Sequence, residues 1–368
     1  MRKTVRPINA GLRKLVIICP FFHGSGSGVA TYYQLLAEQL GRRGVELIII
    51  SDREKGHFRG KYYRLFPRRC GRNRSRYRDI LNYGIQNILY LRLLPIIRSE
   101  RPESLLIHSS FYNHPGLFIY YAKKLRQQYG GRMVADVRDQ LMPAEKIHYL
   151  NIYDSIISCS LNVKAHLIKN RAEKEKLVHI PVIQEPLEIK KGDAQRVLLK
   201  YGLSENKYIF YAGLVKEEKG VQLLLQTFCH YLQRNDLKLV LAGFNKLKNA
   251  DAKNMLEHPE VLYIGNQDRN TILALMCKAA LCVNLSFSEG MPRASLEAID
   301  LGRPVLLPKG IPEFDMHCPD NVVKVMEPKM VAKQFEKILI ARKHSNYPIE
   351  QHRVKNTIDQ YFEVLFDA

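Results

Sequence analysis

Residues 281–308, "LCVNLSFSEGMPRASLEAIDLGRPVLLP", carry the clearest structural pattern in the chain. An apolar run, residues 281–286, precedes a polar loop and then a segment with helical periodicity. Pro292 suits the first position of that helix because its missing N–H would be unpaired there, and Gly302 suits the position just after the last turn. Pro304 stops the helix and opens another apolar run. The stretch predicts a strand–loop–helix–strand unit in which unpaired N–H groups at the start of the helix are aimed at the loop.

The same alternation of apolar strands and helical segments, such as residues 29–43 and 115–128, extends over the whole chain. The predicted strands form two series: 15–19, 45–51, 104–108, 132–137, 155–160 and 177–181, then 207–213, 237–243, 261–265, 281–286, 304–308 and 321–325. Such strands are typical of parallel sheets covered by helices on both faces. The sequence therefore predicts an α/β protein with two doubly wound, Rossmann-like domains. Residues 181–193, which combine prolines and charge without periodicity, separate a domain over 1–185 from one over 186–349.

Charge is the most unusual feature of the composition. The 368 residues carry a formal net charge of +21, which favours an anionic partner such as a membrane surface, a nucleic acid or a phosphorylated substrate. Basic side chains interleaved with aromatic ones concentrate in residues 53–78.

The short apolar run near the N-terminus predicts a buried strand rather than a signal peptide, and no run is long enough to span a bilayer. The seven cysteines have no metal-ligand spacing, which indicates the reduced thiols of a cytosolic protein.

Two carboxylates in the opening stretch are placed for binding chemistry. Glu289 lies in the loop before the predicted helix, and Glu297 lies two turns into the helix. A carboxylate in such a place accepts hydrogen bonds from sugar hydroxyls, as the acidic residue of a dinucleotide fold does for ribose. The alternative is that Glu297 is an ordinary solvated residue of the helix. The same alternative applies to Lys219, a basic residue earlier in the chain, which would then be an ordinary charged residue at the start of a helix.

At this point the sequence resembles a known family. The spacing E-x7-E from Glu289 to Glu297 resembles the signature of retaining glycosyltransferases of family 4, which have the GT-B fold. The resemblance recurs in the family's order over most of the chain, in "YAGLVKEEKGVQLLLQTF" (211–228), "LKLVLAGFN" (237–245), residues 261–286 and the glycine loop, helix and strand of 24–51. It implies two Rossmann-like domains with a cleft between them and a C-terminal helix, 350–368, that packs back on the first domain.

The resemblance also implies a donor-binding set. Its members are Gly26, Gly28, Gly213, Lys219, Gly265, Glu289, Gly290, Met291, Pro292, Arg293 and Glu297. Glu297 would bind the ribose hydroxyls, Glu289 and the backbone that follows it would hold the donor sugar, and Lys219 would neutralise the departing diphosphate. The family usually has an arginine where this chain has Leu214, and Lys216 or Arg293 are the residues that could replace its charge. No metal ion and no cofactor besides the nucleoside diphosphate sugar are implied.

In the first domain, "DVRD" ends the strand over 132–137 and is similar to a motif of a subgroup of the family. Arg138 would meet a phosphate and Asp139 would take the proton of the acceptor hydroxyl, so the implied catalytic residues are Lys219, Glu289, Arg138 and Asp139. The alternative is a local ion pair at a strand end. His108, at the end of another strand, and His114 are more often structural.

The predicted function is metal-independent, retaining transfer of a sugar to a hydroxyl of a lipid-linked glycan, in the synthesis of bacterial lipopolysaccharide or capsule. The basic region over 53–78 would hold the enzyme at the anionic inner face of the plasma membrane, or would be a solvated loop.

Two alternatives stay open: a GT-B sugar-nucleotide epimerase or hydrolase, and a nucleic-acid-binding protein without a recognised motif. An oxidoreductase is disfavoured because the glycines at 24, 26 and 28 do not form G-x-G-x-x-G, and no G-K-[ST] indicates a P-loop.

Overall fold

The chain divides into two compact units. The computed structural model describes residues 13–19, 22, 28–51, 60–65, 90–109, 122–140, 142, 144–189, 191–232, 234, 236–341 and 344–367. Unit 1 consists of Met1–Cys159, Val163–Ile183 and Val354–Ala368, and unit 2 of Ser160–Asn162 and Gln184–Arg353. Within the described ranges no helix has both the length and the apolar character needed to cross a bilayer.

Unit 1 is built on a seven-stranded parallel sheet in the order β3-β2-β1-β4-β5-β6-β7. The strands are β1 (Lys14–Ile18), β2 (Glu46–Ser51), β3 (Lys61–Arg64), β4 (Ser104–His108), β5 (Arg132–Val137), β6 (Ser155–Ser158) and β7 (Leu177–His179). The central strands are buried along nearly their whole length, as their continuous apolar character predicts. Both sheets of the protein are wholly parallel, so the predicted α/β class is confirmed.

Strand β3 was not predicted, because it lies within the basic and aromatic region over 53–78. It pairs with β2 at the edge of the sheet, with Ile48 opposite Lys61 and Ser51 opposite Arg64. Lys61 Nζ and Tyr63 Oη each donate to the buried Glu100 carboxylate at 2.7 Å. Within residues 60–65, therefore, part of the basic character is used in an ion pair of the fold. The rest of 53–78 lies outside the described residues.

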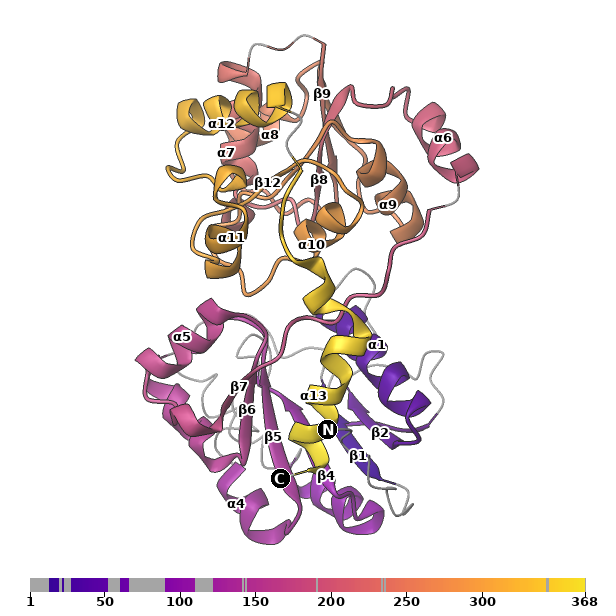
Figure 1. Ribbon diagram of the computed structural model, residues 1–368, viewed down its shortest axis with the longest axis vertical. Coiled ribbons are helices and arrows are strands. Elements are labelled where there is room, and N and C mark those ends of the chain that lie inside the picture. The colour runs from indigo at the N-terminus through magenta and orange to yellow at the C-terminus, as the bar shows by residue number, and fades with distance from the viewer. Residues whose placement is uncertain are drawn as a thin grey trace, which may run out of the picture. The chain divides into compact units, whose positions relative to one another are not determined.

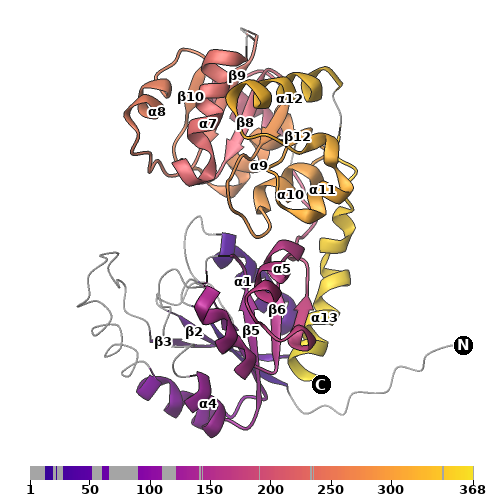
Figure 2. The ribbon, with the colours of Figure 1, turned by 90° about the vertical axis from the view of Figure 1, so that its left-hand side faces the viewer.

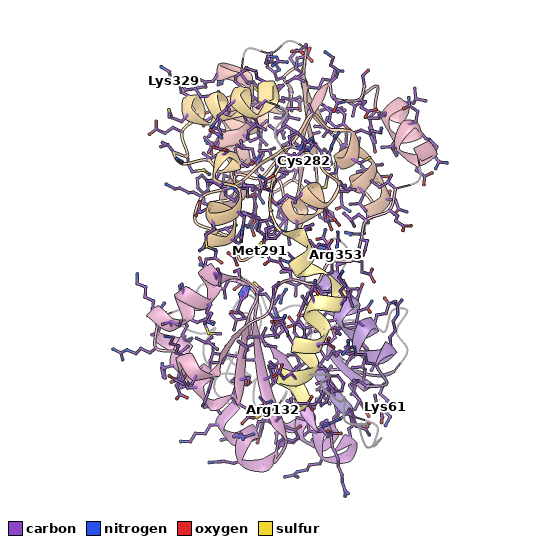
Figure 3. The ribbon with its side chains drawn as sticks, in the orientation of Figure 1. Lys61, Arg132, Cys282, Met291, Lys329 and Arg353 are labelled. Atoms are coloured by element: carbon purple, nitrogen blue, oxygen red, sulfur yellow. The ribbon has the colours of Figure 1, made fainter. Side chains whose placement is uncertain are left out.

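Helices cover both faces of this sheet. They are α1 (Gly28–Arg42), α4 (Ala122–Gln128), α5 (Leu161–Lys169) and α13 (Val354–Phe366), with 3-10 turns η1 (Ala144–Ile152) and η2 (Lys174–Lys176); residues 90–100 are also helical. The C-terminal helix α13 contacts α1, β4 and β5 (Figures 1 and 2). Arg132, labelled in Figure 3, lies at the start of β5. Its Nε donates to the carbonyl oxygen of Val364 at 2.6 Å. A cation at the C-terminal end of a helix also complements the helix dipole.

Unit 2 has a five-stranded parallel sheet in the order β10-β9-β8-β11-β12. Its strands are β8 (Tyr208–Ala212), β9 (Lys238–Ala242), β10 (Val261–Tyr263), β11 (Leu281–Val283) and β12 (Val305–Leu306). Its helices and turns are α6 (Lys191–Lys200), η3 (Glu217–Lys219), α7 (Val221–Gln226), η4 (Thr227–Tyr231), α8 (Ala250–Met255), α9 (Arg269–Lys278), α10 (Arg293–Asp300), α11 (Pro312–His317), η5 (Pro319–Asn321), α12 (Pro328–Ala341) and η6 (Ile349–His352). Helices α7, α8 and α12 lie on one side of β8 and β9, and α6 and α9 on the other (Figure 1).

Two local predictions for unit 2 were wrong. Residues 321–325 form no strand; only Val322 makes an isolated bridge, with Leu307, because a 3-10 turn starting at Pro319 precedes it. Pro292 is the residue before α10 rather than its first residue, because its ψ of 110° is extended. Gly302 does adopt the left-handed conformation, with a φ of +63°, just after that helix.

Candidate functional site

The loops at the carboxyl edge of the second sheet pack closely because two of their glycines have no side chain. Gly220 has a φ of +70°, and a Cβ there would lie 2.0 Å from the carbonyl oxygen of Leu285. At Gly243, with a φ of +142°, a Cβ would lie 1.8 Å from the carbonyl oxygen of Gly213. Only glycine permits these contacts, which join the loop after β8 to the loops after β11 and β9.

Hydrogen bonds fix the loop after β11, residues 284–292. The backbone N–H of Phe287 donates to the carbonyl oxygen of Glu218 at 3.2 Å, and Asn162 Nδ2 donates to the carbonyl oxygen of Glu289 at 2.8 Å. On the other side, Glu217 Oε1 accepts from the N–H of Asn249 at 3.0 Å. The backbone on either side of Lys219 and at Glu289 is therefore held in place before any ligand binds.

Lys219 and Glu289 face each other from these two loops. Lys219 Nζ donates to Glu289 Oε1 at 2.5 Å. Their side chains are 28% and 18% exposed, so the pair is partly shielded but reachable from solvent. An ammonium in such a position attracts an incoming anion, and the carboxylate can accept hydrogen bonds from hydroxyl groups.

Glu297 is buried and holds two arginines on one oxygen. Its Oε1 accepts from Arg269 Nη1 at 2.6 Å and from Arg293 Nε at 3.1 Å. Arg293 lies one turn earlier on the same helix, whereas Arg269 is the first residue of α9. The other end of α10 is fixed by Asp300, which accepts from Arg353 Nη1 at 2.9 Å. Sequence reasoning missed Arg269, because nothing in the spacing links residues on two different helices.

The remaining predicted donor-binding residues of unit 2 lie along the same sheet edge. Gly213 follows β8, and its N–H donates to the carbonyl oxygen of Ala242 at 2.9 Å. Gly265 follows β10, has a φ of +68° and accepts from the N–H of Gly243 at 2.8 Å. Gly290, Met291 (Figure 3) and Pro292 complete the loop that leads into α10. The structure thus brings the predicted residues of unit 2 to the carboxyl ends of parallel strands, where ligands bind in open α/β sheets.

In unit 1, polar residues from three elements form a buried cluster. Tyr33 Oη donates to Asp136 Oδ2 at 2.6 Å and lies 3.2 Å from His108 Nδ1. Burial lowers the pKa of His108 to about 3, and the nearby positive charge of Arg138 adds to the effect. The ring is therefore neutral, and because Tyr33 Oη donates its proton to Asp136, that oxygen can accept a hydrogen bond from the tautomer of His108 that is protonated on Nδ1. Burial also raises the pKa of Asp136, against the opposing effect of Arg138.

Arg138 belongs to this cluster as well. Its Nη1 lies 3.4 Å from Asp136 Oδ1, its guanidinium carbon lies 3.6 Å from the centre of the Tyr32 ring, and its side chain is 7% exposed. Its Nη1 also donates to Tyr361 Oη on α13 at 3.5 Å, and Tyr361 in turn accepts from Tyr32 Oη. This geometry matches the local ion pair that the sequence left open as the alternative, while contact with a phosphate stays a prediction.

The other predicted residues of the first domain have fewer contacts that indicate a functional role. Gly28 is the first residue of α1, and among the described residues outside its own helix and chain neighbours no atom lies within 4 Å of the place of a Cβ. Asp139 directly follows Arg138 and is partly exposed, so its role stays a prediction. His108 is buried at the end of β4 and structural in its contacts. Gly26 and His114 lie outside the described residues.

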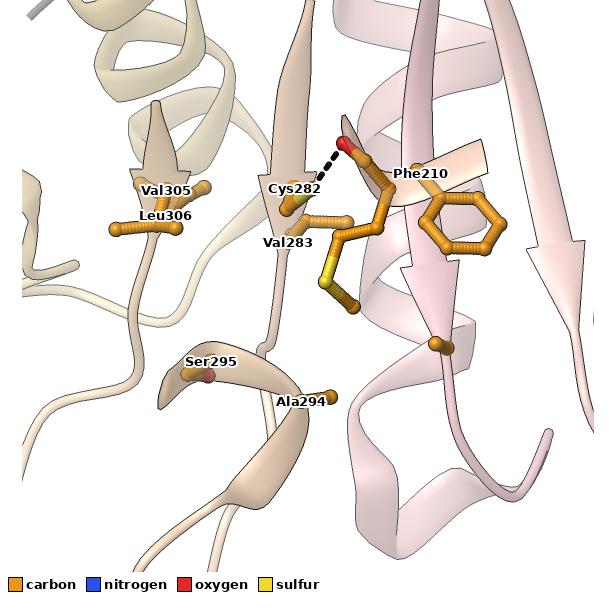
Figure 4. Close-up of a pocket in the computed structure, with 9 residues that line it drawn as sticks. Phe210, Cys282, Val283, Ala294, Ser295, Val305 and Leu306 are labelled. Atoms are coloured by element: carbon orange, nitrogen blue, oxygen red, sulfur yellow. Dashed lines mark hydrogen bonds between the residues drawn. The ribbon is translucent and has the colours of Figure 1, made fainter. Parts of the chain in front are cut away.

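A small apolar pocket lies beneath the first turn of α10 (Figure 4). It is lined by Phe210, Ala212, Met276, Cys282, Val283, Ala294, Ser295, Val305 and Leu306. Cys282 Sγ approaches the carbonyl oxygen of Met276 at 3.7 Å within it. Neither Lys219 nor Glu297 lines the pocket, so it is a packing gap under the helix rather than the polar site itself.

Comparison with known proteins identifies the family. Residues 206–340 match the sequence profile described as glycosyl transferases group 1. An uncharacterized glycosyltransferase of Methanocaldococcus jannaschii is 21% identical over 262 residues, which span 66% of this chain and 65% of that protein. The chain therefore aligns with less than two thirds of the archaeal relative.

Solved structures identify the fold. Sucrose-phosphate synthase from Thermosynechococcus elongatus matches with a TM-score of 0.77 and 14% identity, over 96% of this chain and 98% of that one. Anabaena HepE, in complex with UDP and glucose, matches with a TM-score of 0.68 and 12% identity, over 96% of each chain. These matches and the family profile confirm the predicted family and fold. Residues 206–340 of the chain therefore match the glycosyl transferases group 1 family, and the chain has the GT-B fold.

Proposed function

We propose that this protein is a retaining glycosyltransferase that moves a sugar from a nucleoside diphosphate sugar to an acceptor hydroxyl. The observation that carries the proposal is the Lys219–Glu289 pair, with Nζ and Oε1 2.5 Å apart, at the same sheet edge as the buried Glu297. The pair combines a cation for a diphosphate with a carboxylate for sugar hydroxyls. UDP and glucose are the ligands in the structure of HepE, which supports a nucleotide sugar as donor here.

In the proposed reaction, the bond between the anomeric carbon and the diphosphate oxygen breaks, and its electron pair stays on the diphosphate. The acceptor oxygen forms its bond to the same face of that carbon and passes its proton to the departing phosphate oxygen, in place of the role that the resemblance implied for Asp139. Lys219 stabilises the negative charge that develops on the leaving group, because a fixed cation at that point needs no rearrangement during the reaction. Glu289 holds the hydroxyls of the transferred sugar.

This chain has Leu214 where the family usually has an arginine, so a second positive charge for the diphosphate must come from another residue. Arg293 is engaged with Glu297 at 3.1 Å, whereas Lys216 Nζ is 3.7 Å from Glu218, whose side chain is 73% exposed. The Lys216 side chain is only 20% exposed, but an ion pair whose carboxylate lies in solvent contributes little stability, so Lys216 can leave it at low cost. We therefore assign the replacement of the family arginine to Lys216.

A thermal-shift panel of UDP, GDP and ADP sugars tests the proposal. The true donor at about 100 times its Kd should stabilise the domain that binds it by about 2.7 kcal/mol, roughly a 5–10 °C rise in Tm. The other nucleotides should give much smaller shifts. The absence of any shift across the panel would contradict the proposed donor class. With the donor identified, release of free sugar or an epimerised nucleotide without an acceptor would favour the epimerase or hydrolase alternative.

For the acceptor, we propose a lipid-linked glycan of a bacterial surface polysaccharide, reached at the inner face of the plasma membrane. The support is the net charge of +21 and its concentration in residues 53–78. Each basic residue near an anionic leaflet contributes on the order of 1 kcal/mol. Sedimentation with vesicles containing phosphatidylserine should bring down the protein, and replacing the arginines at 68, 69, 72 and 74 by serine should reduce the bound fraction. If that variant sediments as the wild type does, the membrane proposal is wrong.

A further inference from the structure

Arg269 lies at a position that its own helix disfavours. It is the first residue of α9, directly after the capping residue Asp268, and the first turn contains no acidic residue. The partial positive charge at a helix N-terminus repels a cation there. The guanidinium is stabilised instead from another helix, by the carboxylate of Glu297 at 2.6 Å. The local structure of α9 therefore gives no reason for an arginine, whereas the contact with Glu297 does.

The two arginines occupy one oxygen of Glu297. Arg269 Nη1 and Arg293 Nε both donate to Oε1, and a carboxylate oxygen accepts through two lone pairs. Arg293 moves with α10, since it lies on the same helix as Glu297. Arg269 comes from a different helix, so it fixes the rotation of the carboxylate relative to the sheet edge. Oε2 has no hydrogen-bond partner among the described residues and keeps its lone pairs for a ligand.

The contacts place Arg269 at the Glu297 end of the site rather than at the Lys219–Glu289 end. Its side chain is 45% exposed, and its contact with Glu297 is its one ion pair within the described ranges. We infer that Arg269 is a positioning residue: it orients Glu297 so that Oε2 accepts hydrogen bonds from the ribose hydroxyls of a nucleotide. It thereby sets a preference for ribonucleotides over 2′-deoxyribonucleotides. This inference rests on the proposed function.

Calorimetric titration of the full chain with UDP, GDP, ADP and their 2′-deoxy counterparts tests the inference. For the best-bound base, the wild type should prefer the ribonucleotide. Arg269→Gln should weaken ribonucleotide binding about tenfold, the scale of a charge-assisted hydrogen bond, and deoxynucleotide binding much less. The ratio of the two affinities should therefore shrink. Arg269→Lys, which keeps the charge, should retain most of the preference.

Lys278→Gln is the matched control, because it removes an ion pair with Glu205, 3.0 Å long, from the last turn of the same helix. It should leave the ratio unchanged. A wild-type ratio in Arg269→Gln, or a wild type without ribose preference, would overturn the inference and leave the donor class intact. Failure of the wild type to bind any of these nucleotides would instead overturn the proposed function. If Arg269→Gln does not fold, Arg269→Met, which also removes the charge, replaces it, and a wild-type ratio in that variant would overturn the inference.

Discussion

Replacing Lys219 by alanine is expected to lower kcat by about 10²–10³-fold, the usual effect of removing a group that stabilises developing negative charge. The effect should stay within that range rather than exceed it, because Lys216, assigned above as the replacement for the family arginine, leaves one cation at the site. Stability should change little, since a partly exposed ion pair contributes about 0–1 kcal/mol. Initial rates with a saturating donor and the melting temperature of the same sample measure both effects.

Lys337→Ala is the control for this experiment. Lys337 Nζ lies 3.4 Å from Asp320 Oδ1 at the surface, so the variant removes the same kind of pair away from the site. It should keep wild-type turnover. If Lys219→Ala and Lys337→Ala have similar turnover, Lys219 does not act on the leaving group and the site assignment fails.

Gly220→Ala is expected to destabilise unit 2 by about 2–5 kcal/mol. The left-handed backbone, with a φ of +70°, costs an alanine about 1–2 kcal/mol, and the new Cβ would lie 2.0 Å from the carbonyl oxygen of Leu285. That oxygen belongs to the backbone, so the loops must separate, at a further cost of about 1–3 kcal/mol. Urea denaturation followed by circular dichroism measures the loss.

Gly202→Ala separates these two effects. Gly202 has a similar φ, +61°, but no atom of the described residues, its chain neighbours aside, lies within 4 Å of the place of its Cβ. Its substitution should therefore cost only the backbone part, about 1–2 kcal/mol. Equal losses in the two variants would mean that the close packing of the loops after β8 and β11 contributes nothing to stability.

The sequence was sufficient for most strands because each central strand is buried on both faces and therefore reads as a continuous apolar run. It failed where that rule does not apply. Strand β3, "KYYR", lies at the edge of the sheet and keeps charged side chains exposed, so its pattern resembles a basic surface loop. Conversely, residues 321–325 contain the buried Val322 and Val323 without strand geometry. Burial alone makes a short segment apolar, whether or not it joins a sheet.

The residues of the candidate site also include some that the sequence could predict and some that it could not. Lys219, Glu289 and Glu297 could be predicted because the family resemblance marks their positions. The pairing of Arg269 with Glu297 could not, because it depends on the packing of α9 against α10. Asp136 did give a signal that was not used: a single carboxylate within the buried strand "RMVADV" requires partners, and Tyr33 and Arg138 supply them.

The position of α13 has a consequence for the synthesis of the protein. This helix covers β4 and β5 of the first sheet, yet it follows every strand of the second sheet along the chain. All five strands of the second sheet lie between Tyr208 and Leu306, so they are complete before α13 exists. During translation the first sheet must therefore wait, with that part of its apolar face uncovered, while the whole of the second sheet is made.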